Sequence, residues 1–292
     1  MENPVESTES KAQDQTYLQM VPAVDQATRI LFLLANMVGG ESSLTELSRE
    51  AGISKSKGLA ILNTLRSSGL VTRNDRTKAY RLGPNLLLLS RSLLNHTDLA
   101  QEAGPFLEEL AMANGCTMLL TVLSGESVFV VARRHAPGGA YVAVNVGNRY
   151  PIPWGAHGRA ILATMSPEEV ERRLAPDSVL LASETGNEKI DLAALRTDIE
   201  EARRTGYGQS LGTTWSGLNA VAAVLRVSAS PGEAMETSRV VGCLVAVGHF
   251  GREKAAEIGE GLVTAGPEIS RRLGPLMDSV NLHFPLSRPL FS

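Results

Sequence analysis

The chain has 292 residues, which at roughly 100–200 residues per domain is enough for two domains. Hydrophobic residues make up 43% and charged residues 20%, so the chain can form packed cores and disorder throughout is excluded. A net charge of −3 is too small to make the whole molecule a polyanion binder, so any DNA-binding surface has to be local. The two cysteines, Cys116 and Cys243, are too few for a disulfide framework and indicate a reducing compartment.

No apolar run approaches the ~18 residues that a membrane-spanning helix needs. The first residues are acidic and polar, unlike the basic and then apolar start of a signal peptide. We expect residues 1–20 to form an acidic disordered tail and residues 276–292 to form a C-terminal tail. The folded part is expected between these tails, in a cytoplasmic protein.

Residues 21–84 carry the element order of a winged helix-turn-helix. Ser43, with Glu46 three residues later, forms a capping-box pattern, and Ser54 can cap the next helix. Glycines follow the helices, and a polar, basic turn separates two short runs that predict a hairpin, the wing. The predicted elements are helices over about 24–35, 45–51 and 55–68 and strands at 70–72 and 79–82.

The third helix and the wing concentrate positive charge. Between Ile53 and Arg81 there are seven lysines and arginines against Asp75 alone, a local balance of +6. DNA phosphates attract such a patch, and the amino end of a recognition helix meets base edges in the major groove. The DNA-contacting candidates in this patch are Ser54, Lys55, Ser56, Lys57 and Arg66 on the helix and Arg73, Arg76 and Lys78 in the wing.

A solvated charged face is the alternative explanation of this patch. That is what most charge runs are, but the ordered series of cap, short helix, glycine turn, basic helix and basic hairpin favours DNA binding. Single-stranded nucleic acid is disfavoured because Tyr80 is the only aromatic residue near the patch.

The remainder of the chain mixes helices and strands. Residues 86–110 are helical in period with a break expected near Gly104-Pro105, and we take 85–104 as a linker helix and 105–275 as a second domain. The predicted strands are 117–123, 127–134, 141–146, 218–227 and 240–247, and the predicted helices are 155–165, one opening at Ser166, 191–204 and 253–273. This mixture indicates an α+β sensor-like domain rather than a doubly wound sheet.

The segment Trp154-Gly155-Ala156-His157-Gly158-Arg159 is the strongest candidate for a ligand site in the second domain. Backbone amides at a helix start bind anions, and small residues let a ligand approach them. His157 and Arg159 could add charge-assisted bonds to a carboxylate. In the structural alternative, the glycines serve a tight turn and close packing, His157 is a satisfied polar residue and Arg159 faces water.

Several stretches together resemble the IclR (isocitrate lyase regulator) family of bacterial transcription factors. They are VDQATRIL at 24–31, LTELSREAGISKS at 44–56, YRLGP at 80–84, PIP at 151–153 with GRAILA at 158–163, and RRTGY at 203–207. The resemblance implies a winged-helix domain, a linker helix and a GAF-like effector-binding domain. It also implies DNA binding as a dimer or dimer of dimers, and control by a small molecule, often an organic acid or aromatic compound.

By resemblance, Lys55, Ser56, Lys57, Leu59 and Asn63 recognise DNA, and the pocket extends beyond residues 154–158 to Ser210, Leu218, Ala220, Ala246 and Gly248. The chain departs from the family at Gly58 and Ala60, which puts the operator sequence in doubt, and it has no acidic residue in 209–213. We therefore expect a roomier, less polar pocket, which Met118, Trp154 and Trp215 could also line.

These observations predict a ligand-responsive, sequence-specific DNA-binding regulator, with repression favoured over activation. One alternative is a DNA-binding protein whose second domain only assembles the oligomer. Another is an enzyme, which is disfavoured because the chain lacks a nucleophile elbow, a P-loop and clustered metal-ligand spacing. We predict no catalytic residues, no metal site and no cofactor.

Overall fold

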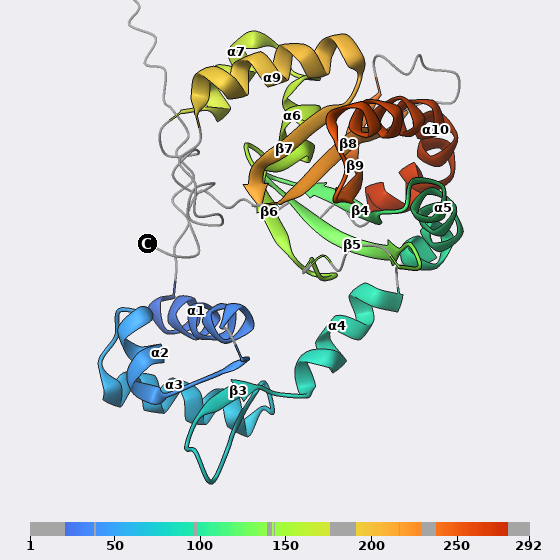
Figure 1. Ribbon diagram of the computed structural model, residues 1–292. Helices are drawn as coiled ribbons and strands as arrows, with labels where there is room; N and C mark the ends of the chain where they lie inside the picture. Colours follow the sequence, from blue (N-terminus) through green and yellow to red (C-terminus); the bar gives the residue numbers. More distant parts are fainter. Residues whose placement is uncertain are drawn as a thin grey trace, which may run out of the picture. The chain divides into compact units, whose positions relative to one another are not determined.

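The computed structural model of the chain describes residues 21–279 except 38, 96–97, 139–141, 143, 176–190, 216 and 229–237 (Figure 1). Both predicted tails therefore lie almost entirely outside the described residues. The chain divides into two compact units between Ser90 and Arg91, which we describe separately. This division falls inside the predicted linker range of 85–104. Within the described part, no helix is long and apolar enough to cross a membrane.

The first unit is a three-helix domain with a small antiparallel sheet. Its helices and strands are α1 (Pro22–Asn36), β1 (Glu41–Ser42), α2 (Leu44–Glu50), α3 (Lys55–Ser67), β2 (Val71–Arg73) and β3 (Tyr80–Leu82). The strand order is β1-β3-β2. The core consists of fully buried side chains from all three helices and the sheet, including Ile30, Leu47, Leu62 and Tyr80. The predicted winged helix-turn-helix is confirmed, and only β1, which has two residues, was not predicted from the sequence.

The predicted caps are present at both helix starts. The Ser43 Oγ accepts the Glu46 N–H at 3.2 Å, and the Ser54 Oγ accepts the Lys57 N–H at 3.3 Å. The second half of the capping box differs from expectation because the Glu46 carboxylate accepts the Ser42 hydroxyl at 2.7 Å. These bonds satisfy amides that a helix start leaves without intrahelical partners.

The second unit contains one six-stranded antiparallel sheet between two helical layers. It comprises α5 (Asp98–Asn114), β4 (Thr117–Ser124), β5 (Ser127–His135), β6 (Arg149–Pro151), α6 (Gly155–Leu162), α7 (Pro167–Arg173), α9 (Leu192–Thr205), β7 (Gly208–Trp215), β8 (Leu218–Val227), β9 (Arg239–Gly248) and α10 (Arg252–Ser279), while α4 (Asn85–Asn95) spans the division. The strand order is β6-β5-β4-β9-β8-β7. Helices α5 and α10 pack on one sheet face, and α6, α7 and α9 pack on the other (Figure 1). The predicted α+β class is confirmed, and the architecture is consistent with a GAF-like fold.

Two sequence predictions about this unit were wrong, and one strand was not predicted. Helix α5 runs through Pro105 without the expected break, because the burial of the face that includes Leu99, Ala103 and Leu107 outweighs the ~3 kcal/mol penalty of an internal proline. The described residues of 141–146 form no strand, and the sheet edge is β6 instead. Strand β7 was not predicted because its glycine-rich, polar sequence lacks strand periodicity.

Gly58 of α3 is buried against α2, which explains why this helix carries a glycine there. A Cβ at Gly58 would overlap the Oγ of Ser48, a buried atom that has no hydrogen-bond partner among the described residues. Without that oxygen, the nearest remaining atoms of α2 are Ser48 Cβ and Leu44 Cδ1, at 3.4 and 3.5 Å, which is ordinary contact. Gly58 is therefore a packing residue between the two helices and does not face DNA.

The two substitutions Gly58→Ala and Ser48→Ala should be strongly non-additive. We expect Gly58→Ala alone to change the free energy of unfolding little or to lower it, and the double variant to raise it by about 1 kcal/mol through helix propensity and removal of the unpartnered hydroxyl. Urea denaturation of the four proteins of the cycle measures this coupling. If Gly58→Ala stabilised the wild type and the Ser48→Ala variant equally, the close contact between Gly58 and Ser48 would be contradicted.

Candidate functional site

Helix α3 presents one apolar face and one polar face. Gly58, Ile61, Leu62 and Leu65 are buried in the unit's interior. The candidate DNA-contacting residues Ser54, Lys55, Ser56, Lys57, Leu59, Asn63 and Arg66 are all exposed at the cap of α3 or on the helix. The amphipathic pattern of α3 thus leaves every predicted contact residue of the helix available to a ligand.

The wing is a tight turn that holds its basic residues outward. The Asn74 side chain accepts the N–H groups of Arg76 and Thr77 at 2.9 and 3.2 Å, and Lys78 has a φ of +60°. Arg73 lies 5.4 Å from the ring centroid of Tyr80, while Arg73, Arg76 and Lys78 are all exposed. Within the described part of the chain, no ion pair is formed by these three wing residues. The same holds for Lys55, Lys57 and Arg66 of α3. The surface of α3 and the wing therefore keeps an excess of positive charge, with Asp75 as its one acidic residue between Ile53 and Arg81.

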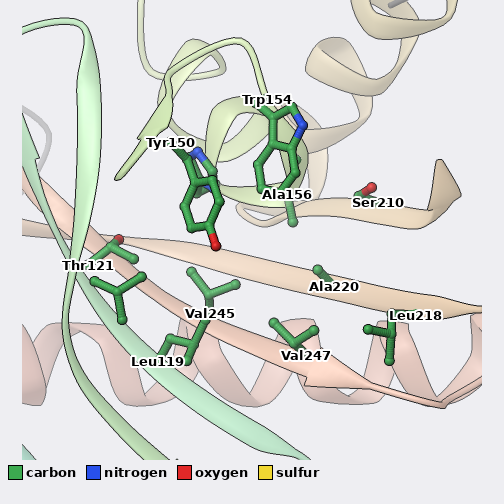
Figure 2. Close-up of a pocket in the computed structure, with 13 residues that line it drawn as sticks. Leu119, Thr121, Tyr150, Trp154, Ala156, Ser210, Leu218, Ala220, Val245 and Val247 are labelled. Atoms are coloured by element: carbon green, nitrogen blue, oxygen red, sulfur yellow. The ribbon is translucent and has the colours of Figure 1, made fainter. Parts of the chain in front are cut away.

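A cavity of about 20 Å³ lies in the second unit, between the start of α6 and the sheet face that α6 covers. Figure 2 shows Tyr150 and Trp154 on one side of it and strand side chains, including Val245 and Val247, on the other. It is lined by Leu119, Thr121, Val130, Tyr150, Trp154, Gly155, Ala156, His157, Ser210, Leu218, Ala220, Val245 and Val247. This volume holds about one water molecule. The expectation of a roomy pocket was therefore wrong for this structure, although the lining is largely apolar as expected.

Two stacked aromatic rings occupy much of the space at the cavity. The rings of Tyr150 and Trp154 are 4.5 Å apart and inclined by 7°, and the His157 ring lies 6.0 Å from each of them. Burial raises the pKa of Tyr150 to about 12, so its phenol is protonated at neutral pH. The wall therefore offers π faces and a neutral hydroxyl.

His157 is a buried, neutral residue. Its side chain is 4% exposed, and its Nε2 lies 3.3 Å from the carbonyl oxygen of Pro151. Burial lowers the pKa of His157 to about 4, with a smaller contribution from the Arg159 guanidinium in the same direction. At neutral pH the Nε2 must carry the single ring proton to donate to Pro151.

Arg159 does not line the cavity. Its guanidinium donates to Asp198 Oδ2 at 2.7 Å and to the Gly155 carbonyl at 2.9 Å, and the residue is buried. The Arg159 guanidinium is therefore occupied by Asp198 and Gly155, and no lysine or arginine lines the cavity.

Four predicted pocket residues do not line the cavity. Met118 and Ala246 pair with each other in the β4–β9 ladder and contribute to the core under α5 and α10, whereas their neighbours Leu119 and Val245 face the cavity. Side chains alternate along a strand, so a one-residue error in register places a residue on the wrong face. A Cβ on Gly248 would meet Cys116 and Phe250, and one on Gly158 would overlap the Ile152 carbonyl oxygen. The side chain of Trp215 lies outside the described residues.

The predicted residues that do line the cavity are Trp154, Gly155, Ala156, His157, Ser210, Leu218 and Ala220. The sequence analysis missed Leu119, Thr121, Val130, Tyr150, Val245 and Val247. The alternation within 117–123 could have identified Leu119 and Thr121 as one face, but not which face carries the cavity.

Because His157 is neutral in the folded state, it should make the protein sensitive to acid. In the unfolded chain His157 binds a proton near pH 6.5, whereas in the folded chain it stays neutral down to about pH 4. The free energy of unfolding therefore falls as the pH drops from 6.5 to 4. The loss is on the order of 3 kcal/mol. We expect His157→Gln to flatten the dependence of the free energy of unfolding between pH 7 and 4, with the exposed His249→Gln as the matched control. An unchanged slope in His157→Gln would contradict the buried neutral state.

Comparisons with known proteins give one family for both units. The model described as bacterial transcriptional regulator IclR C-terminal matches residues 91–271, and that of the IclR helix-turn-helix domain matches residues 23–75. An HTH-type transcriptional regulator of Mycobacterium tuberculosis is 31% identical over 206 residues, 70% of this chain and 77% of that protein. These families and this relative are transcriptional regulators, not enzymes.

Solved structures give the same result. The IclR transcriptional regulator from Alicyclobacillus acidocaldarius has a TM-score of 0.68 at 26% identity, covering 88% of this chain and all of that chain. An IclR homologue from Microbacterium hydrocarbonoxydans, crystallised with 4-hydroxybenzoate, has a TM-score of 0.63 at 22% identity, covering 86% and 99% of the two chains. The second likeness shows the fold alone.

Proposed function

Since the chain belongs to the IclR family of bacterial transcriptional regulators, we propose that it is a ligand-responsive repressor that binds a specific operator. Residues 21–84 bind DNA, residues 85–104 link the domains, and residues 105–275 bind the effector and assemble the oligomer. Such a protein acts on DNA and therefore works in the cytoplasm.

The observation that carries the DNA-binding proposal is the unpaired basic surface of α3 and the wing. An exposed helix face fits the major groove, and its uncompensated lysines and arginines attract phosphates. We assign base reading to Lys55, Ser56, Lys57, Leu59 and Asn63 on the exposed face of α3. Ser54, Arg66 and the wing residues Arg73, Arg76 and Lys78 are assigned to the phosphate backbone.

An exposed run of leucines on α4 supports assembly from identical subunits. Leu87, Leu88 and Leu89 have exposed fractions of 74, 63 and 61%. Exposed large apolar side chains gathered on one short helix indicate an interaction site, and a second copy of the chain would cover them. A dimer places two α3 helices in successive major grooves of a near-palindromic operator, about 34 Å apart. The protein would act as such a dimer or as a dimer of dimers.

The cavity beneath α6 is the proposed effector site, for a small organic acid or aromatic compound. No side chain caps α6, so its first-turn amides at Gly155, Ala156 and His157 can bind a carboxylate. The stacked rings of Tyr150 and Trp154 suit an aromatic body. Because the cavity holds about one water, an effector enters only if these rings move apart. That movement would give the effector its different affinities for two conformations of the protein.

Lys55→Ala combined with Lys57→Ala should weaken DNA binding without unfolding the protein. Both side chains are exposed and unpaired, so their loss removes charge and no packing. We expect affinity for DNA from upstream of the protein's own coding region to fall, and affinity for unrelated DNA to fall less, because base contacts supply the specificity. Fluorescence anisotropy with the upstream DNA and with unrelated DNA measures both quantities.

The matched control is Arg252→Ala combined with Lys254→Ala, which removes the same charge from the start of α10. Equal losses in both double variants would mean that net charge, rather than the α3 face, governs binding. Unchanged affinity in the Lys55/Lys57 variant would exclude the assigned recognition face.

Filling the cavity should abolish the effector response. Ala220 lines the cavity from β8, so the added methyl groups of Ala220→Val fill the cavity. Valine is favoured in strands, so β8 itself should be preserved. In a thermal-shift screen of aromatic and aliphatic acids that includes 4-hydroxybenzoate, we expect the wild type to be stabilised by RT ln(1 + [L]/Kd) and Ala220→Val not to be.

Met118→Leu, on the opposite sheet face, should retain the response in the same screen. If Ala220→Val responds like the wild type, the effector binds elsewhere. If no acid stabilises the wild type, the second unit is better explained as an assembly domain.

A further inference from the structure

A second hollow lies in the second unit and shares no lining residue with the effector cavity. Its volume is about 260 Å³, against about 20 Å³ for the effector cavity. It is lined by Gly206, Ala223, Val224, Arg226, Val263, Gly266, Pro267 and Ser270, from the end of α9, strand β8 and helix α10. We call this surface the α10 groove.

The groove is open because no strand lies along one edge of this part of β8 in the described chain and because the facing residues of α10 are small. Strand β7 pairs with β8 only as far as Gly208 opposite Ala222, so beyond Ala222 the described chain places no strand along that edge of β8. Helix α10 passes this edge with Gly266 and Pro267, which carry no long side chain. A Cβ on Gly266 would meet only the Val224 carbonyl oxygen, at 3.9 Å. The groove therefore has open space at its centre.

Arg226 is the charged residue among those that line the groove. Its Nη1 donates to the Ser238 carbonyl at 2.8 Å, and in the described part of the chain no carboxylate pairs with its guanidinium. Burial lowers the pKa of Arg226, but an arginine stays protonated in proteins.

The rest of the groove is apolar with one hydroxyl. Ser270 is buried, and its Oγ accepts the Arg226 backbone N–H at 3.1 Å. Val224 is half-buried, and Val263 and Pro267 are exposed, so the groove walls beside Arg226 are hydrocarbon. A half-buried charge without a counter-ion is costly, and a carboxylate that shares its planar donors would offset this cost.

We propose that the α10 groove binds a small monocarboxylate with a short hydrocarbon body. The carboxylate pairs with Arg226, and the hydrocarbon lies against Val224, Val263 and Pro267. This site stands independently of whether the effector cavity binds anything.

Isothermal titration with hexanoate, and with hexan-1-ol as the uncharged probe, tests the proposal on the full-length protein. We expect hexanoate to bind the wild type, hexan-1-ol to bind at least tenfold more weakly, and Arg226→Gln to bind hexanoate at least tenfold more weakly. Arg172→Gln, which removes an exposed arginine on α7, and Ala220→Val, which fills the effector cavity, should both bind hexanoate as the wild type does.

A second variant keeps the test valid if Arg226→Gln fails to fold. Gly266→Leu fills the groove from α10 and leaves Arg226 in place, and it should also lose hexanoate binding. The proposal is overturned if hexanoate does not bind the wild type at millimolar concentration, if Gly266→Leu binds it normally, or if Ala220→Val alone abolishes binding. A change in oligomeric state on size-exclusion chromatography of Arg226→Gln would also overturn it, because Arg226 would then pair with an acid of a second copy.

Discussion

The register of one antiparallel sheet determines where this protein can bind a small molecule. In the β4–β9 ladder Leu119 pairs with Val245 and Met118 with Ala246, and successive pairs face opposite helical layers. One face is sealed by α5 and α10, and the other carries the cavity beneath α6. A slip of one residue would exchange the two faces, so the proposed effector site depends on the same pairing that builds the core.

The sequence predicted the DNA-binding unit well because its signals are local. The caps at Ser43 and Ser54, the glycines that end helices and the basic hairpin each depend on a few neighbouring residues. Trp154, Gly155 and Ala156 were found for the same reason, since they form one continuous helix start. Met118 and Ala246 were misplaced because the choice of sheet face depends on strand pairing between distant segments. Tyr150 was missed because nothing local links it to Trp154, on which it stacks.

The charges of the two units are used in opposite ways. In the first unit the lysines and arginines of α3 and the wing are exposed and unpaired, which suits a polyanion. Around the cavity, Arg159 is bound to Asp198 and His157 is neutral, so an acidic effector would rely on backbone amides and aromatic contacts. In the function we propose, the stacked rings separate to admit the effector, and this separation is the structural change through which the effector acts.

The most direct test of the account is a mobility-shift titration on DNA from upstream of the protein's own coding region, at two salt concentrations and with excess competitor DNA. The account predicts a complex that weakens as salt is raised but survives the competitor, because phosphate contacts supply affinity and α3 supplies specificity. Loss of every complex to the competitor, or no complex even at low salt, would contradict specific recognition of this DNA by the α3 face.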